Sequence, residues 1–128
     1  MTELKGEVFS GSGEAAGFLR IEEYSRFLED ILGEKPFPGT LNLRVGIDKL
    51  EELKKTLPSK RLEPFEKDGN EFGGINVFPV KFEETDALLL EIDKTHHGDS
   101  VAEIVASLEL REKYSLKDND TVTVKERS

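Results

Sequence analysis

Short runs of strand length, separated by turn residues, are the feature that most restricts the fold of this chain. In the stretch PFPGTLNLRV, residues 36–45, leucine and valine alternate with asparagine and arginine, which is the period of a half-buried strand. Asp68-Gly69 lies between two further strand-like runs and is a strong hairpin signal. Since no regular strand–helix–strand alternation follows, we predict a mainly β fold with short helices, organised as a small barrel.

The same patterns predict the individual elements. Gly73-Gly74 and Pro79 interrupt one run, so a bulge or a sheet edge is expected there. A helix closed by Gly33 and a helix opened by an Asp48/Glu51 capping box are also predicted. Strands are expected over residues 4–10, 40–45, 62–66, 71–82, 87–92 and 121–125, and helices over residues 24–32, 48–56, 101–108 (capped by Asp99 or Ser100) and 110–114.

Composition narrows the class of protein. A length of 128 residues favours a single domain over 1–128, and the absence of cysteine excludes disulfides and thiolate metal sites. The net charge of −9, without a basic patch, argues against binding to nucleic acid. No apolar run is long enough to span a membrane, and no signal peptide is evident at the N-terminus. We therefore expect a cytoplasmic protein, without a nucleic-acid or membrane partner, that acts as a monomer.

Thr40 and Asn42 are candidate metal ligands. Both side chains leave the same face of the 40–45 strand, opposite the leucines. A hydroxyl and an amide oxygen can ligate Mg²⁺, which prefers oxygen and often shares its coordination shell with substrate phosphates. Two neutral ligands suit such a site if the phosphates bring the negative charge. The alternative is a polar strand face in contact with water.

A glycine-bearing loop follows the first strand. Gly11, Gly13 and Gly17 permit positive φ angles and let backbone N–H groups face a phosphate. The spacing is neither a Walker A motif nor a dinucleotide-binding fingerprint, because no Gly-Lys-Ser/Thr follows and position 16 is alanine. A plain flexible turn is the alternative.

The remaining polar residues give weaker signals. His96 and His97 are adjacent and lack a third ligand, so a structural or loop role is favoured, and a ligand contact in this loop is the alternative. Glu103 is expected on the polar face of the 101–108 helix, where it could simply be solvated. Arg111 could meet a phosphate, whereas Asp118 and Asp120 are expected to shape the turn before the last strand. No Ser-His-Asp arrangement is evident.

Five segments together resemble one family, the archaeal CTP-dependent riboflavin kinases. They occur in the family's order and with similar gaps over nearly the whole chain. The segments are GEVFSGSGEAAGFL (residues 6–19), ILGEKPFPGTLNLRV (31–45), FGGINVFPVKF (72–82), DKTHHGDSVAEIVA (93–106) and LELREKYSLKDNDTVTV (108–124).

This resemblance implies a six-stranded cradle-loop (RIFT-like) β-barrel and a kinase that transfers the γ-phosphate of CTP to the 5′-hydroxyl of riboflavin, giving FMN and CDP. It implies Mg²⁺ bound by Thr40 and Asn42, and flavin contacts at Thr95 and Glu103. Glu103 is also the candidate general base. The implied nucleotide contacts are Gly11, Ser12, Gly13, Glu14, Ala15 and Ala16 in the glycine loop, and Leu108, Glu109, Leu110 and Arg111 in a second segment.

The sequence is also consistent with two other functions. One is a non-enzymatic cradle-loop barrel that binds a nucleotide or flavin, or contacts DNA, for which the segment LKDNDTVTV is suitable. The acidic balance disfavours the DNA-contacting variant. The other is a flavin or nucleotide carrier that binds without turnover.

Overall fold

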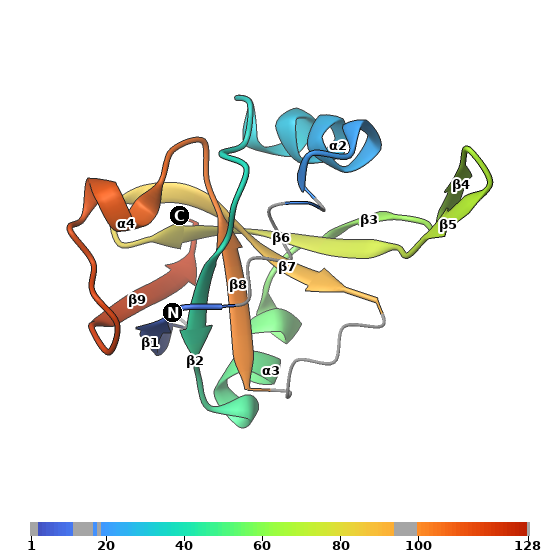
Figure 1. Cartoon of the computed structure of the whole chain (residues 1–128). Helices are drawn as coiled ribbons and strands as arrows, with labels where there is room; N and C mark the ends of the chain where they lie inside the picture. The colour runs from blue at the N-terminus through green and yellow to red at the C-terminus, as the bar shows by residue number, and fades with distance from the viewer. Residues whose placement is uncertain (1–2, 12–16, 18, 94–99, 128) are drawn as a thin grey trace.

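The computed structural model describes residues 3–11, 17, 19–93 and 100–127 (Figure 1). Strands dominate these residues, and the helices between them are short. None of the helices described is long and apolar enough to cross a membrane. The elements are β1 (Glu3–Phe9), α2 (Glu22–Leu32), β2 (Leu41–Arg44), α3 (Ile47–Thr56), β3 (Lys60–Leu62), β4 (Phe65–Lys67), β5 (Asn70–Phe72), β6 (Ile75–Phe82), β7 (Thr85–Ile92), β8 (Val101–Val105), α4 (Leu110–Lys113) and β9 (Thr121–Glu126).

Six antiparallel strands close into a barrel in the order β6-β7-β8-β2-β1-β9. Closure depends on β6, which pairs with β7 along its whole length and with β9 only from Val80 to Phe82. Its first part, Ile75–Val77, pairs instead with the short strand β3. Pro79 lies between these two partners, at a local edge where a missing N–H is tolerated. The predicted mainly β barrel is confirmed, and so is the edge at Pro79.

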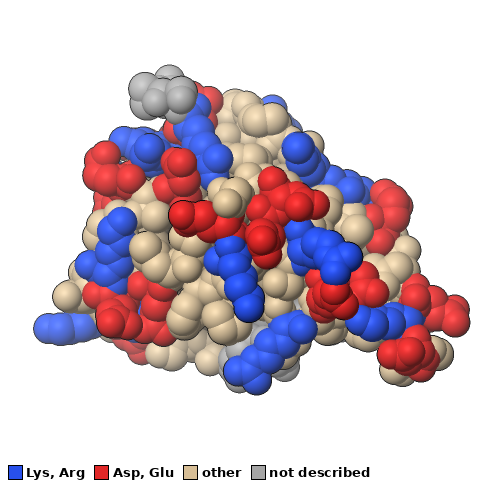
Figure 2. All heavy atoms as spheres, turned by 90° about the horizontal axis from the view of Figure 1, so that it is seen from above, with Lys and Arg blue, Asp and Glu red and all other residues tan. Residues whose placement is uncertain are grey.

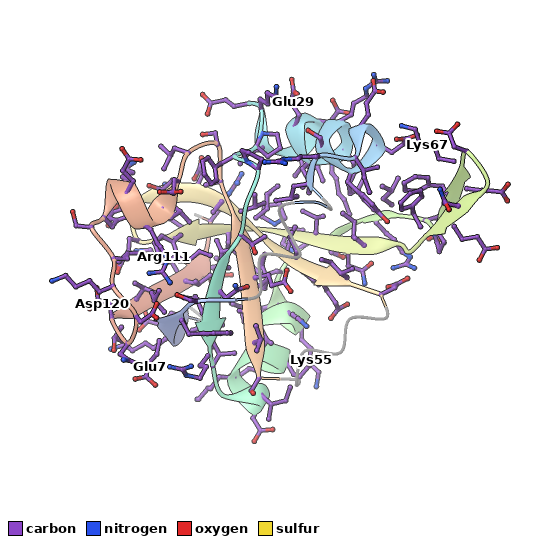
Figure 3. All side chains as sticks on the ribbon, viewed as in Figure 1. Glu7, Glu29, Lys55, Lys67, Arg111 and Asp120 are labelled. Carbon is purple, nitrogen blue, oxygen red and sulfur yellow. The ribbon has the colours of Figure 1, made fainter. Side chains whose placement is uncertain are left out.

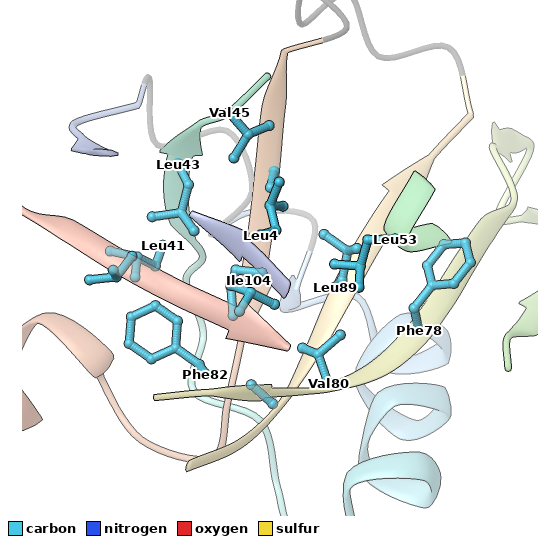
Figure 4. Packing of buried hydrophobic residues seen from close by; sticks show 14 of the residues in the cluster. Leu4, Leu41, Leu43, Val45, Leu53, Phe78, Val80, Phe82, Leu89 and Ile104 are labelled. Atoms are coloured by element: carbon cyan, nitrogen blue, oxygen red, sulfur yellow. The ribbon is translucent and has the colours of Figure 1, made fainter. Parts of the chain in front are cut away.

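The barrel interior is apolar because alternate residues of each strand point inward. In β1, for example, Leu4 and Val8 are buried while Glu3, Lys5 and Glu7 are exposed. Figure 4 shows the side chains of several strands meeting inside the barrel. Residues of this inner core include Leu4, Leu41, Leu43, Leu53, Val80, Phe82, Leu89, Ile104, Leu110 and Val124.

A second apolar cluster lies on the outside of the barrel, beneath α2. Tyr24 and Leu28 of the helix pack there against Leu88 and Val105. The Tyr24 hydroxyl donates a hydrogen bond of 2.6 Å to the carbonyl of Gly73, and burial raises the pKa of this phenol. The helix ends at Gly33, whose φ of 86° is left-handed, as its position in the sequence predicts.

The hairpin β4–β5 projects from the barrel beyond α2 (Figure 1). Its turn residues Asp68 and Gly69 both have positive φ, 53° and 81°, as a two-residue hairpin turn requires. Phe65 and Phe72 stack across the hairpin with ring centroids 5.2 Å apart. The hairpin predicted from Asp68-Gly69 is confirmed.

Two predicted details are wrong. Residues 101–105 form the strand β8, not a helix, and β8 pairs with both β2 and β7. Because apolar residues cover both faces of this central strand, its alternation is lost and the spacing of Val101, Ile104 and Val105 imitates a helix. The capping box is also absent, since α3 begins at Ile47 after Gly46 without a side-chain cap. Asp48 instead lies in the first turn, where a carboxylate suits the helix dipole.

Candidate functional site

The loop that enters β2 is attached to the end of β8. The backbone N–H of Phe37 donates to the carbonyl of Ala106 at 2.8 Å, and the N–H of Gly39 donates to the carbonyl of Phe37, also at 2.8 Å. The chain turns tightly here, so that a Cβ added to Gly39 would lie 3.2 Å from the Phe37 ring. Thr40 is therefore held immediately before the first paired residue of β2.

A pocket of about 250 Å³ opens between this loop and the segment after β8. Thr40 lines it from one side and Arg111 from another, so two groups of predicted site residues meet in one cavity. Ile104 and Leu41 form its apolar floor, and Phe37 forms an aromatic wall. The lining residues are Phe37, Gly39, Thr40, Leu41, Ile104, Ala106, Leu108, Glu109, Leu110 and Arg111.

Asn42 lies on the outer face of β2, opposite the inner leucines. It pairs with Phe9 of β1 and with Glu103 of β8. Gly11, the first residue of the glycine loop, approaches it so closely that an added Cβ would lie 2.0 Å from its Nδ2. A larger residue at position 11 would therefore displace the Asn42 side chain. Ser12, Gly13, Glu14, Ala15 and Ala16 lie outside the described residues.

Glu103 is a charged residue that the structure buries, with an exposed fraction of 6%. It lies on β8 between Asn42 of β2 and Leu90 of β7. The expectation of a helical Glu103 is therefore wrong, and so is the alternative of a solvated one. Burial of a carboxylate is costly unless other groups hydrogen-bond or neutralise it, and Glu103 is not without such an interaction. Its place beside Asn42 keeps it among the candidate site residues. Thr95, His96 and His97 lie outside the described residues.

Arg111, which lines the pocket, contacts two residues outside it, and we call the three the Ser10–Arg111–Asp118 cluster. Nη2 of Arg111 donates to Oδ1 of Asp118 at 2.7 Å and to Oγ of Ser10 at 3.3 Å. Oγ of Ser10 also lies 3.0 and 3.1 Å from the two Asp118 carboxylate oxygens, to which it donates. The bond from Arg111, and then that from Ser10, lowers the pKa of Asp118. Figure 3 shows Arg111 near α4 and the turn that carries Asp120.

The two aspartates of this turn have different roles. Asp120 accepts a hydrogen bond of 2.8 Å from the backbone N–H of Lys117, so it shapes the turn as predicted. Asp118 instead uses its side chain to hold Arg111 and Ser10. Sequence reasoning missed Ser10 and Phe37 as site residues. Ser10 carried one weak signal, since it directly precedes the glycine loop, whereas Phe37 carried none.

A larger groove, of about 780 Å³, adjoins the pocket and shares Phe37 with it. It lies between α2 and the loop before β2. Arg20, Arg26 and Lys35 line it together with two glutamates, and Arg26 is ion-paired with Glu22. The mixed charges identify no particular ligand.

Neither the surface charge nor the grouping of acidic and histidine side chains identifies a ligand by itself. In the view of Figure 2, basic and acidic side chains are interspersed, without a continuous basic field over that face. Among the residues described, no three His, Cys, Asp or Glu side chains gather where they could hold a metal ion. Among the predicted metal ligands, Thr40 lines the pocket and Asn42 lies beside Gly11 at the start of the glycine loop.

Comparison with known proteins places this chain in a family. The family model CTP-dep_RFKase, described as "Domain of unknown function DUF120", matches residues 8–125. A riboflavin kinase of Ignicoccus hospitalis is 40% identical over 124 residues, which cover 94% of this chain and 69% of that protein. A riboflavin kinase of Methanosarcina mazei is 37% identical over 94% of this chain and 54% of its own length. One of Pyrobaculum aerophilum is 36% identical over 94% of this chain and 59% of its length.

The chain thus spans little more than half the length of the second and third of these relatives. The match nevertheless includes β2, β8, α4 and the turn before β9, which carry the described site residues. The chain therefore belongs to the riboflavin kinase family that the CTP-dep_RFKase model describes.

Proposed function

We propose that this chain is a CTP-dependent riboflavin kinase, which converts riboflavin and CTP into FMN and CDP. The observation that carries the proposal is the pocket of about 250 Å³ in which Thr40 meets the 108–111 segment. These two segments are the metal-binding and nucleotide-binding segments implied by the family resemblance. The names of the family model and of the relatives support the same reaction.

The reaction needs positioning and charge neutralisation more than covalent chemistry by the protein. The 5′-oxygen of riboflavin forms a bond to the γ-phosphorus of CTP. The bond from that phosphorus to the β–γ bridging oxygen breaks, its electron pair stays on CDP, and the hydroxyl proton leaves. We propose that the carboxylate of Glu103 accepts this proton, because Glu103 is buried beside Asn42.

The residues present fit a magnesium ion. Thr40 and Asn42 provide two neutral oxygen donors two residues apart, and the close approach of Gly11 brings the start of the glycine loop to Asn42. When bound, Mg²⁺ would neutralise phosphate charge that a chain of net charge −9 cannot offset by itself. Arg111 would offer guanidinium N–H donors to a phosphate, while Asp118 offsets its charge.

The nucleotide preference is proposed to come from the pocket wall. Phe37 offers an aromatic face to a base, and the backbone of residues 108–111 offers hydrogen-bonding groups to the edge of cytosine.

The test is to incubate the protein with riboflavin, Mg²⁺ and each of CTP, ATP, GTP and UTP, and to measure FMN by chromatography. We expect most FMN with CTP. More FMN with another nucleotide would contradict the CTP preference alone. No FMN from folded protein with any nucleotide would contradict the kinase, and binding of CDP or riboflavin by that sample would then favour a carrier.

A further inference from the structure

Asp118 lies outside the pocket, yet it contacts two residues that border the proposed nucleotide site. It accepts from Arg111 at 2.7 Å and from Ser10 at 3.0 Å. Arg111 lines the pocket, and Ser10 is the residue directly before the glycine loop. One carboxylate therefore connects the two segments implied to bind the nucleotide.

The backbone holds Asp118 in this position from two sides. After α4 the chain folds back, and the N–H of Leu116 donates to the carbonyl of Arg111 at 2.9 Å. The next residue of the turn, Asn119, has a φ of 77° and donates its N–H to the carbonyl of Val8 in β1 at 2.7 Å. Asp118 is thus held between α4 and the end of β1 before any ligand binds.

The geometry of Arg111 leaves donors for a ligand. Its contacts with Asp118 and Ser10 both use Nη2, so they do not consume the N–H groups on Nε and Nη1. An arginine held by one side of its fork loses less side-chain entropy when a phosphate or base binds the other side. The lowered pKa of Asp118 keeps its carboxylate charged at neutral pH.

We propose that Asp118 is a positioning residue for nucleotide binding, which holds Arg111 and Ser10 so that the pocket and the glycine loop face the same nucleotide. This inference rests on the proposed function. It predicts an effect on the KM for the nucleotide, with little change in kcat or in the KM for riboflavin. The pair is partly exposed, with side-chain exposures of 33% and 52%, so the effect is modest and weakens in high salt.

The experiment compares Asp118→Ala and Asp118→Asn with the wild type in FMN formation, and measures CDP binding by calorimetry. We expect a KM for CTP about three- to fivefold higher in Asp118→Ala, the size of effect that a surface ion pair supports. Asp118→Asn, which can still accept both hydrogen bonds, should lie between Asp118→Ala and the wild type. Asp86→Ala is the matched control, since Asp86 is an exposed aspartate near an arginine, Arg127, at 3.8 Å and does not line the pocket.

A double-mutant cycle separates positioning from a general loss of stability. Asp118→Ala should raise the KM for CTP less in an Arg111→Ala background than in the wild type, because one of its two partners is gone and only the contact with Ser10 remains. Additive effects would overturn the proposal, and so would equal KM values for Asp118→Ala and Asp86→Ala. If Asp118→Ala does not fold, Asp118→Asn and Arg111→Lys provide the same comparison. Inactive wild-type protein would contradict the proposed function, whereas active wild type with an unaffected Asp118→Ala would contradict this inference alone.

Discussion

The two faces of the β2–β8 pair differ in chemistry although they share one backbone. The inner face carries Leu41, Leu43 and Ile104, which are buried in the barrel core. The outer face carries Asn42 and Glu103, which are paired in register. Because side chains alternate along a strand, the polar candidates lie on one face and the core residues on the other, although Leu41 and Ile104 also line the pocket. We therefore expect that Asn42 can be replaced with little effect on the core, and that Leu43 can be replaced with little direct effect on the outer face.

The sharpest test of this comparison replaces neighbours on opposite faces. Leu43→Ala should lower the free energy of unfolding by about 2–5 kcal/mol, because it leaves a cavity in a fully buried core. Asn42→Ala should lower it by less than about 1 kcal/mol, since the side chain is only half-buried. Urea unfolding measures both values. A similar loss in the two variants would show that the faces are not independent.

The next largest effect is expected from Glu103→Gln, which keeps the shape of the side chain and removes its charge. If Glu103 accepts the hydroxyl proton, kcat for FMN formation should fall by about 100-fold. Glu71→Gln, on the projecting hairpin, is the control and should match the wild type. An unchanged kcat in Glu103→Gln would remove this residue from the role of general base.

The smallest effect concerns the contact between the glycine loop and the outer face of β2. Gly11→Ala would place a Cβ 2.0 Å from Nδ2 of Asn42, so the Asn42 side chain must move. We expect a KM for CTP about tenfold higher, equivalent to about 1.4 kcal/mol of binding free energy. Gly17→Ala is the matched control, because among the described residues no atom lies within 4 Å of an added Cβ there. Equal KM values in the two variants would contradict a role for this close approach.

The strand β8, which was predicted as a helix, shows where prediction from the sequence fails and where it succeeds. Strands with one polar face, such as β1 and β9, alternate clearly and were predicted nearly to the residue. The strand β8 is buried on both faces, by the inner core and by the cluster under α2, so its alternation is lost. The same pairing explains why the burial of Glu103 was not predicted from the sequence. Its environment is formed by β7 and β2, and not by its neighbours in the sequence.

The sequence by itself determined the elements whose signals are local. The alternation of PFPGTLNLRV determined β2, Asp68-Gly69 determined the projecting hairpin, and Gly33 determined the end of α2. These signals act through the conformational preferences of a few adjacent residues, so they are visible without the rest of the chain.

Only the tertiary structure decided which distant residues meet. Ser10 and Asp118 are 108 positions apart, and they are brought together by the pairing of β1 with β9 and with the turn before it. Asn42 meets Glu103 because the register of β2 and β8 buries the leucines on the other face. Register is set by the summed burial and hydrogen bonding of whole strands, which no short stretch of sequence contains.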